Sequence, residues 1–349
     1  MCIRDSLYSC HIEITMINFA ILGLGRIGKI HVANIASDPK CNIECIYDID
    51  NSISLEISKK YGCKVSLSAE EAISTPNVDA VCICSATPTH TKYILLAAKA
   101  GKAIFCEKPI DLSIERVNDC RKELQKYNVP IQIGFNKRFD PSHLSAKEKK
   151  DKGEIGVLEQ ILITSRDPSG PSAEYLKVSG GMFRDQTIHD FDFVCFILGN
   201  DSIDEIFAIG DRLFSKEAKE AKDIDTAMII LRSKSGVFCH INNSRHSSYG
   251  YDQRVEFFGS KGMLISENLT PTSVRKYGDD YTDSKDPILD FFIERYEIAY
   301  KHELEVFVDC IINKKPTPVN FEDGRNALII ADAAYDSLNT GKSVKIKFD

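Results

Sequence analysis

Short apolar runs alternate with stretches of helical spacing over the first 135 residues. The apolar runs are 17–22, 43–47, 78–85, 103–106 and 130–135. Runs that are apolar at nearly every position are typical of parallel strands buried on both faces. Between them, apolar residues recur every three or four positions, as in amphipathic helices. The pattern predicts an α/β unit over residues 16–135, with a doubly wound parallel sheet of the Rossmann type.

The pattern changes after residue 136, where strands follow one another without intervening helices. Two pairs of runs, 225–243 and 254–267, turn at Ser-Lys-Ser-Gly and Gly-Ser-Lys-Gly and predict hairpins. Long helices are expected near 289–313 and 322–338. These features predict an α+β domain over residues 136–349, with a large open mixed or antiparallel sheet and helices on one face. The other face would expose apolar residues, so we expect it to form a subunit interface.

Composition narrows the class of protein. The chain has 349 residues, 43% of them apolar, and a net charge of −7. It contains no apolar run of about 18 residues, so no membrane span is expected, and the mild acidity argues against a nucleic-acid partner. Twelve cysteines are scattered without zinc-site spacing, which favours reduced thiols and a cytoplasmic location. Residues 1–15 are interpreted as a disordered extension or a misassigned start, because the predicted fold begins at Met16.

A glycine-rich turn joins the first predicted strand to the first helix. Gly23, Gly25 and Gly28 form Gly-x-Gly-x-x-Gly, with Arg26 and Ile27 inside the motif. The first glycine permits the tight turn, the second lets a pyrophosphate approach the backbone, and the third lets helix and strand pack closely. Such turns also join ordinary strands and helices, so the motif alone is weak evidence for a nucleotide site.

An acid at the end of the second predicted strand strengthens the nucleotide interpretation. Asp48 follows an apolar run and lies 20 residues beyond Gly28. A carboxylate at this place accepts hydrogen bonds from ribose hydroxyls and repels a 2′-phosphate, which favours NAD over NADP. The alternative is an acid in an ordinary turn.

Ligands of doubly wound sheets bind at the carboxyl ends of the strands. This rule brings the glycine turn, Asp48 and the ends of two further strands to one edge. The residues predicted to line the cofactor site are Gly23, Gly25, Arg26, Ile27, Gly28, Asp48, Ser85, Thr87, His90, Glu107 and Lys108.

Three residues are candidates for the chemistry. Lys108 follows a predicted strand, where its ammonium would donate hydrogen bonds to a substrate oxygen; the alternative is a solvated lysine. Asp185 and His189 are four apart, so they would share one face of a helix predicted at 185–198. A carboxylate beside an imidazole orients a general base. The alternatives are an N-cap for Asp185 and a half-buried histidine without catalytic function.

Several segments together carry a resemblance to a known family. They are the glycine turn, Glu107-Lys108-Pro109, the run 134–141, the run 179–192 and the run 255–263. With these, residues 16–349 resemble the glucose–fructose oxidoreductase/inositol dehydrogenase/rhizopine-catabolism (Gfo/Idh/MocA) family, most of all its inositol-oxidising members.

The resemblance implies NAD-dependent oxidation of myo-inositol to 2-keto-myo-inositol. It makes Lys108, Asp185 and His189 the catalytic trio: His189 would remove the hydroxyl proton, Asp185 would orient His189, and Lys108 would hold the reacting oxygen. The chemistry needs no metal. The resemblance also implies a homotetramer, and it places the polyol against Lys137, Arg138, Asp140 and Tyr249.

Alternatives remain for the site residues, for the substrate and for the activity itself. Internal ion pairs are an equal interpretation of Lys137, Arg138 and Asp140, and packing is one of Tyr249. Asn136-Lys137 departs from the usual apolar residue and arginine of the family, which leaves the polyol open. The same chemistry on scyllo-inositol, another inositol isomer or a pyranose sugar is one alternative. A non-catalytic NAD-binding sugar sensor is another.

Overall fold

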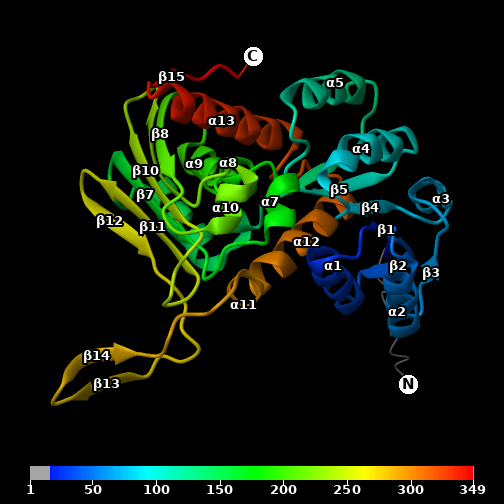
Figure 1. Ribbon diagram of the computed structural model, residues 1–349. Helices are drawn as coiled ribbons and strands as arrows, with labels where there is room; N and C mark the ends of the chain where they lie inside the picture. Colours follow the sequence, from blue (N-terminus) through cyan, green and yellow to red (C-terminus); the bar gives the residue numbers. More distant parts are fainter. Residues whose placement is uncertain (1–15, 349) are drawn as a thin grey trace, which may run out of the picture.

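The computed structural model describes residues 16–348, which form two large sheets with helices packed on both and a small two-stranded sheet (Figure 1). The interpretation of residues 1–15 as an extension lies outside the described residues. The first sheet consists of β1 (Ile17–Leu22), β2 (Cys41–Tyr47), β3 (Lys64–Val65), β4 (Ala80–Ile83), β5 (Ala103–Glu107) and β6 (Ile131–Gly134). Its order is β3-β2-β1-β4-β5-β6, and every pair is parallel. The order reverses beside β1, so the switch point lies between the carboxyl ends of β1 and β4.

Helices cover both faces of this first sheet. They are α1 (Arg26–Ser37), α2 (Asn51–Tyr61), α3 (Ala69–Ser74), the 3-10 turn η1 (Thr87–Thr89), α4 (His90–Lys99) and α5 (Ile114–Leu124). Side chains supply the helix starts: Asp50 caps α2, Ser68 caps α3 and Ser113 caps α5. The core between α3, α4, α5 and the sheet is separate from the core under α1 and α2.

The second sheet is mixed, as predicted. Its strands are β7 (Leu158–Arg166), β8 (Ile203–Asp211), β9 (Thr226–Ser233), β10 (Phe238–Ser244), β11 (Asp252–Gly259), β12 (Gly262–Ser266) and β15 (Val344–Lys345). They run in the order β12-β11-β7-β10-β9-β8-β15. β7 and β10 pair in parallel, whereas the other pairs are antiparallel. Both predicted hairpins, β9–β10 and β11–β12, are present.

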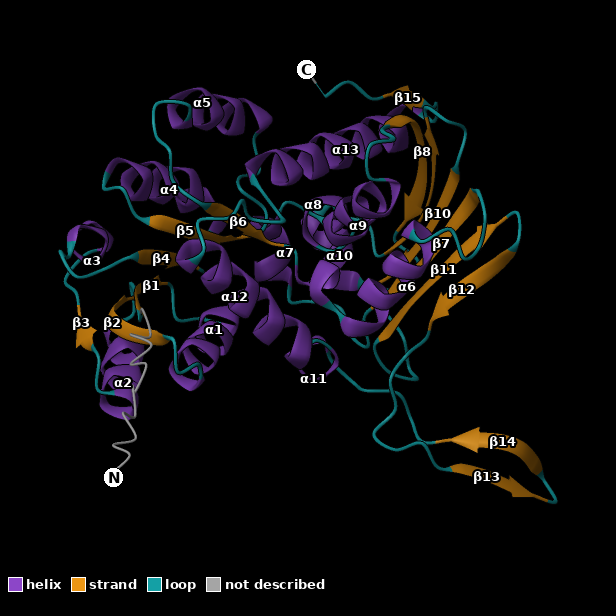
Figure 2. Ribbon diagram, turned by 180° about the vertical axis from the view of Figure 1, so that it is seen from behind, coloured by secondary structure: helices purple, strands orange, loops and turns teal. Residues whose placement is uncertain are grey.

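One face of the second sheet is covered and the other is bare (Figure 2). The remaining helical elements are η2 (Asn136–Phe139), α6 (Pro141–Asp151), α7 (Ala173–Ser179), α8 (Met182–Asp185), α9 (Ile188–Leu198), α10 (Lys216–Ala221), α11 (Phe292–Arg295), α12 (Glu297–Ile312) and α13 (Phe321–Thr340). Apolar residues of α9 and α13 join the covered face in one core. The bare face carries exposed apolar side chains from five strands: Phe207, Ile209, Met228, Ile230, Phe238, Phe258, Met263 and Ile265.

Helix α12 links the two parts of the molecule. Its residues Leu304, Phe307 and Val308 are buried with Phe19 and Phe105 of the first sheet. A helix from the last sixth of the chain therefore completes the core of the first sheet. The predicted division at 135/136 describes the order of the sheets along the chain, but the packing crosses it.

Three local predictions need correction or addition. The helix expected at 185–198 begins at Ile188, after a separate turn, α8. Thr187 at the break donates to Asn243 Oδ1 at 2.7 Å, and Gln186 donates to the Ser165 and Ser244 carbonyls, so tertiary hydrogen bonds interrupt the helix. The helix expected at 289–313 divides near Tyr296 into α11 and α12. A hairpin of β13 (Arg275–Gly278) and β14 (Tyr281–Lys285), not expected, projects from the body (Figure 1).

Within residues 16–348, none of the helices has both the length and the apolar character needed to cross a bilayer.

Candidate functional site

The glycine turn has the geometry of a phosphate cradle. Gly23 has φ +88°, and a Cβ there would lie 2.5 Å from the Cys84 backbone; one on Gly28 would lie 2.0 Å from the Gly23 oxygen. Both glycines are therefore required by close packing of strand and helix. A Cβ on Gly25 would meet nothing within 4 Å. Gly25 thus borders open space at the N-terminus of α1, where unpaired N–H groups attract a pyrophosphate.

Asp48 lies beside this turn, as predicted. Its Oδ2 accepts a hydrogen bond from Leu24 N at 2.5 Å, and its Oδ1 accepts one from Asp50 N at 2.8 Å. The carboxylate thus joins the end of β2 to the glycine turn, and it stays half-buried. This is the place from which an acid reaches an adenosine ribose.

Two histidines contact the ends of β4 and β5: His31 joins α1 to β5, and His90 joins the end of β4 to the end of β5. His31 Nε2 lies 2.7 Å from Glu107 Oε1, and the His31 ring packs against Phe105. His90 uses both ring nitrogens on carbonyl oxygens, those of Pro109 and Ser85, at 2.8 Å each. His90 is therefore a buried brace, and its predicted contact with a cofactor is not supported. Ser85 shares a hydrogen bond with Thr89 at 2.7 Å, and Thr87 lies half-buried in η1.

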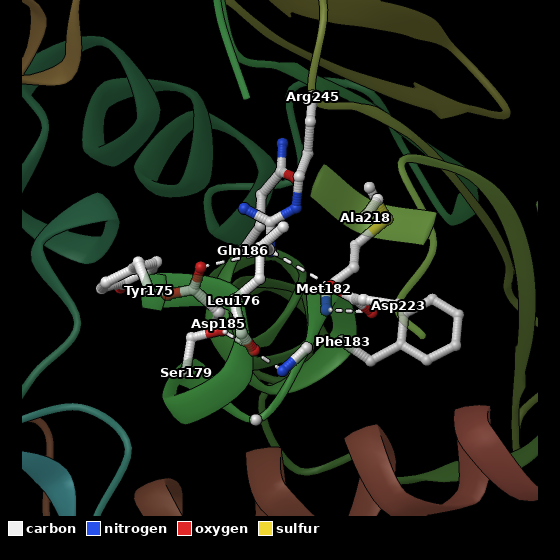
Figure 3. Close-up of polar contacts among 12 residues, drawn as sticks. Tyr175, Leu176, Ser179, Met182, Phe183, Asp185, Gln186, Ala218, Asp223 and Arg245 are labelled. Carbon is white, nitrogen blue, oxygen red and sulfur yellow. Dashed lines mark hydrogen bonds and ion pairs between the residues drawn. The ribbon is translucent and has the colours of Figure 1, made fainter. Parts of the chain in front are cut away.

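Lys108 and Asp185 meet at this edge. Lys108 Nζ donates to the backbone oxygen of Asp185 at 2.7 Å and lies 3.6 Å from its Oδ1. Figure 3 shows Tyr175 and Arg245 reaching the same carboxylate from two other elements. The Tyr175 hydroxyl donates at 2.8 Å to Oδ1, and Arg245 Nη2 donates at 3.2 Å to Oδ2.

These partners keep Asp185 ionised. Burial alone would raise the pKa of Asp185, but the positive charges of Lys108 and Arg245 and the Tyr175 hydrogen bond hold it below its ordinary value. The carboxylate is a fixed anion between two cations. It therefore positions Lys108 in the site.

His189 lies on α9 with its ring edge-on to Phe135, at a centroid distance of 5.9 Å. Burial lowers the pKa of His189 well below its ordinary value, and the charges of Lys108 and Lys137 lower it further. The imidazole is therefore neutral near pH 7, the state that a proton acceptor needs. Its Nδ1 is buried without a hydrogen-bond partner in the described part of the chain.

The predicted pairing of Asp185 with His189 is wrong for this structure. Asp185 ends α8 and His189 belongs to α9, so the two do not share a helix face. Between residues 16 and 348 the Asp185 carboxylate bonds to Tyr175 and Arg245 and not to the imidazole. The three predicted residues nevertheless gather in one place, since the Lys108 charge acts on both Asp185 and His189.

Three of the four residues expected to touch a polyol, Arg138, Asp140 and Lys137, are held in internal ion pairs. Arg138 binds Asp192 with two nitrogens, at 2.5 and 2.8 Å, and both side chains are buried. Asp140 pairs with buried Arg295 and caps α6. The ion-pair alternative therefore describes Arg138 and Asp140, and it describes Lys137 as well, because Lys137 pairs with buried Asp190.

Lys137 and Tyr249 lie on opposite faces of the second sheet. Lys137 Nζ lies 2.6 Å from Asp190 Oδ1 and 2.9 Å from Ser165 Oγ, on the covered face near His189. Tyr249 instead donates to Asp252 and accepts from Arg166, whose side chain leaves β7 on the opposite face from Ser165. Tyr249 is thus placed away from the site.

Sequence reasoning missed Arg245 and Tyr175. Arg245 follows β10 and is buried, with Asp185 at 3.2 Å and Asp223 at 3.9 Å. The polar run Asn242-Asn243-Ser244-Arg245 at the end of a predicted strand was the available signal. Tyr175 comes from a short helix that the apolar pattern did not reveal.

Comparisons with known proteins agree with this geometry. Residues 17–135 match the family model described as "Oxidoreductase family, NAD-binding Rossmann fold", and residues 143–265 match the GFO/IDH/MocA C-terminal domain. The chain is 42% identical over 332 residues to the inositol 2-dehydrogenase of Rhizobium meliloti. The matched residues cover 95% of this chain and 99% of that protein.

Two solved structures are similar over the same length. The myo-inositol dehydrogenase from Corynebacterium glutamicum is 41% identical, with a TM-score of 0.91 over 95% of this chain and 99% of that one. The scyllo-inositol dehydrogenase from Lactobacillus casei with bound NAD(H) and scyllo-inositol is 29% identical, with a TM-score of 0.87 over 95% and 99%. The sequence, the fold and the gathered site residues agree: the chain belongs to the Gfo/Idh/MocA family of oxidoreductases.

Proposed function

We propose that the protein is an NAD-dependent inositol 2-dehydrogenase that oxidises myo-inositol to 2-keto-myo-inositol, in the service of inositol catabolism. The observation that carries this proposal is the gathering of Lys108, Asp185 and neutral His189 near the carboxyl ends of the first sheet. A cation and a neutral base at one place are what oxidation of an alcohol requires. The name and length of the Rhizobium meliloti relative support the same substrate class.

The turn and the acid fit NAD. Open space at Gly25 and the N-terminus of α1 would receive the pyrophosphate, and Asp48 would accept bonds from the ribose. Glu107 is buried and places one carboxylate oxygen on His31, and its second oxygen would contact the cofactor. When bound, NAD accepts a hydride from the substrate carbon.

The chain's own residues handle the proton. Lys108 donates a hydrogen bond to the reacting hydroxyl oxygen and stabilises negative charge that develops there. His189 takes the hydroxyl proton at Nε2, because Nδ1 is buried. Asp185, fixed by Tyr175 and Arg245, holds the Lys108 ammonium in place. Lys137 adds a second positive charge near His189 and helps to keep the imidazole neutral.

The choice of polyol is the open alternative. The Lactobacillus casei structure carries scyllo-inositol, which favours that isomer as the second candidate, ahead of other inositols or a pyranose sugar. A non-catalytic NAD-binding sensor would have no need of a neutral base beside an active-site lysine. Lys108 and His189 are both present, which argues against the sensor.

We also propose that the bare face of the second sheet joins copies of the chain into a homo-oligomer, a tetramer by resemblance. Its exposed apolar side chains, which we call the apolar stripe, come from five strands on both sides of β7. The described cysteines are free thiols, most of them buried, which favours the reducing cytoplasm as the location.

The experiment that tests the function is NADH formation from a panel of polyols. Myo-inositol, scyllo-inositol, other inositol isomers and glucose are each offered with NAD and with NADP. We expect turnover of an inositol with NAD and little with NADP, because Asp48 repels the 2′-phosphate. Normal NAD binding without turnover of any inositol would contradict the proposal that the substrate is an inositol.

A further inference from the structure

A buried histidine links the helix of the glycine turn to the end of β5. His31 lies three residues after Gly28 on α1 and is fully buried. Its ring packs edge-on against Phe105 of β5, at a centroid distance of 4.8 Å, and against Tyr300 of α12, at 6.0 Å. Its Nε2 lies 2.7 Å from Glu107 Oε1. Because a carboxylate can only accept, Nε2 is the donor of this bond, whether or not Nδ1 also carries a proton.

This bond fixes a carboxylate that has little room to turn. Glu107 lies opposite Gly134 of β6 in the register of the sheet. A Cβ on Gly134 would lie 2.9 Å from Glu107 Oε2 and 3.0 Å from Oε1, so the carboxylate rests directly on the glycine backbone. A side chain at this position of β6 would push the carboxylate away. His31 on one side and Gly134 on the other therefore set the direction of the Glu107 carboxylate.

A second acid lies in the same buried layer and leaves His31 to Glu107. Glu303 follows Tyr300 by one turn of α12, and Gln132 of β6 donates to the backbone oxygen of Glu303 at 2.9 Å. Both carboxyl oxygens of Glu303 are buried without a hydrogen-bond partner in the described part of the chain. Burial raises the pKa of Glu303 well above its ordinary value, and the charge of Glu107 raises it further, so Glu303 is neutral. Among the described residues His31 Nδ1 has no partner either, so the polar contact of this histidine goes to Glu107.

The histidine joins two ends of the proposed cofactor site. Gly25, at the N-terminus of α1, borders the open space for a pyrophosphate, and Glu107 ends β5 directly before Lys108. Without the bond from His31, the backbone of Glu107 would stay in place while its side chain could take other staggered rotamers. A binding group contributes its full hydrogen bond only when its neighbours hold it close to the productive direction.

We propose that His31 is a positioning residue for the cofactor: its Nε2 donates to Glu107 Oε1 and so leaves Oε2 directed at bound NAD. This inference rests on the proposed function, in which the second oxygen of Glu107 contacts the cofactor. The bond needs a donor at one point, and it needs neither a charge nor an aromatic ring. A side chain that supplies the same donor should therefore preserve cofactor binding, whereas an apolar side chain of similar size should not.

The test compares His31→Gln with His31→Leu. The amide nitrogen of glutamine can reach the place of Nε2, and leucine has similar bulk without a donor. The dissociation constant of NADH is measured by fluorescence with no inositol present. We expect it to rise at least about tenfold in His31→Leu, as for loss of a hydrogen bond to a charged group, and no more than about threefold in His31→Gln. In steady-state assays the KM for NAD should rise in parallel, while the KM for the inositol stays native.

A double variant shows whether the histidine acts through the acid. Glu107→Ala removes the carboxylate and should itself weaken NADH binding. Adding His31→Leu to Glu107→Ala should cause no further loss, because the group that His31 positions is already absent. A histidine that only supports the fold would give additive losses. His31→Met serves the same comparison if His31→Leu does not fold.

The matched control is His143→Leu. His143 of α6 is also buried, and its Nδ1 lies 2.7 Å from Ser266 Oγ of the second sheet. The control removes a buried, hydrogen-bonded histidine in the same way, and thermal unfolding measures what each variant loses in stability. The NADH dissociation constant of His143→Leu should be native.

The outcomes separate this inference from the proposed reaction. Native NADH affinity in His31→Leu, equal losses in His31→Leu and His31→Gln, or additive losses in the double variant would each overturn the part assigned to His31. The expected NADH constants in a protein that oxidises no inositol would contradict the proposed reaction and leave the part of His31 standing. A native protein that does not bind NADH would overturn both.

Discussion

At the scale of single residues, the site combines a fixed anion, a cation and an imidazole that stays neutral. Asp185 is held below its ordinary pKa by Lys108 and Arg245, and the same lysine helps to lower the pKa of His189. In the proposed mechanism one cation thus serves two purposes, because it would bind the reacting oxygen and its charge favours the neutral imidazole. The arrangement explains why the acid need not touch the imidazole.

Replacing His189 tests whether it is the general base. His189→Asn should lower kcat about 10²- to 10⁴-fold, the usual contribution of a general base, and leave the dissociation constant of NAD unchanged. Steady-state kinetics and NADH fluorescence measure the two. The control is His246→Asn, an exposed histidine, which should behave as the native protein. A full-rate His189→Asn enzyme would show that another group takes the proton.

Single residues also show where sequence reasoning ends. Gly23, Gly28 and Asp48 lie where the motif predicts, because the turn leaves no space for side chains. Arg138 follows a predicted strand in the same way that Lys108 does, yet it is locked onto Asp192. Spacing cannot reveal this pairing, since the partner lies 54 positions away.

At the scale of elements, two glycines of one turn serve different purposes. Gly28 lets α1 pack on the β1 turn, because a Cβ would lie 2.0 Å from the Gly23 oxygen. Gly25 has φ −65° and ψ −164°, which any residue can adopt, and it borders open space. One glycine is therefore needed by the fold and the other by the ligand.

The pair Gly25→Ala and Gly28→Ala separates these needs. Gly28→Ala should destabilise the protein by about 1–3 kcal/mol or more, as overpacking does. Gly25→Ala should keep the native melting temperature and raise the KM for NAD at least about tenfold, because its methyl group takes the space of the pyrophosphate. Thermal unfolding and NAD kinetics measure both. Equal melting temperatures for the two variants would contradict the assignment.

The elements also mark the limit of the periodic pattern. The longer strands of both sheets follow it, since their apolar runs are set by burial, whereas the two-residue strand β15 was not predicted. The break between α8 and α9 does not, because Gln186 and Thr187 bond to residues of the second sheet. The hairpin β13–β14 is exposed along its length, so burial leaves no signal in its sequence.

At the scale of the whole molecule, a single chain leaves the apolar side chains on the bare face of the second sheet exposed to water. This face carries exposed apolar side chains on five strands, and on β8, β9 and β12 they occupy alternate positions, where a solvated face would carry polar ones. Association of two copies through this face would remove the stripe from water.

A charge in the stripe tests the interface. Ile230→Asp, on β9, should shift the native oligomer toward smaller species, with association at least about tenfold weaker. Light scattering after size exclusion measures the mass. Leu67→Asp is the control, since Leu67 is also exposed but lies on the first sheet's side of the molecule. If the mass of the Ile230→Asp oligomer is unchanged, the interface does not involve this face of the second sheet.

The proposed reaction transfers hydrogen from one inositol carbon to NAD, and isotopic labelling follows that hydrogen. Myo-inositol carrying deuterium at carbon 2 is oxidised with NAD, and the NADH formed is examined by mass spectrometry. We expect one deuterium in the nicotinamide ring and a ketone at carbon 2. NADH without deuterium would mean that another carbon is oxidised, and the absence of NADH would contradict the proposed activity itself.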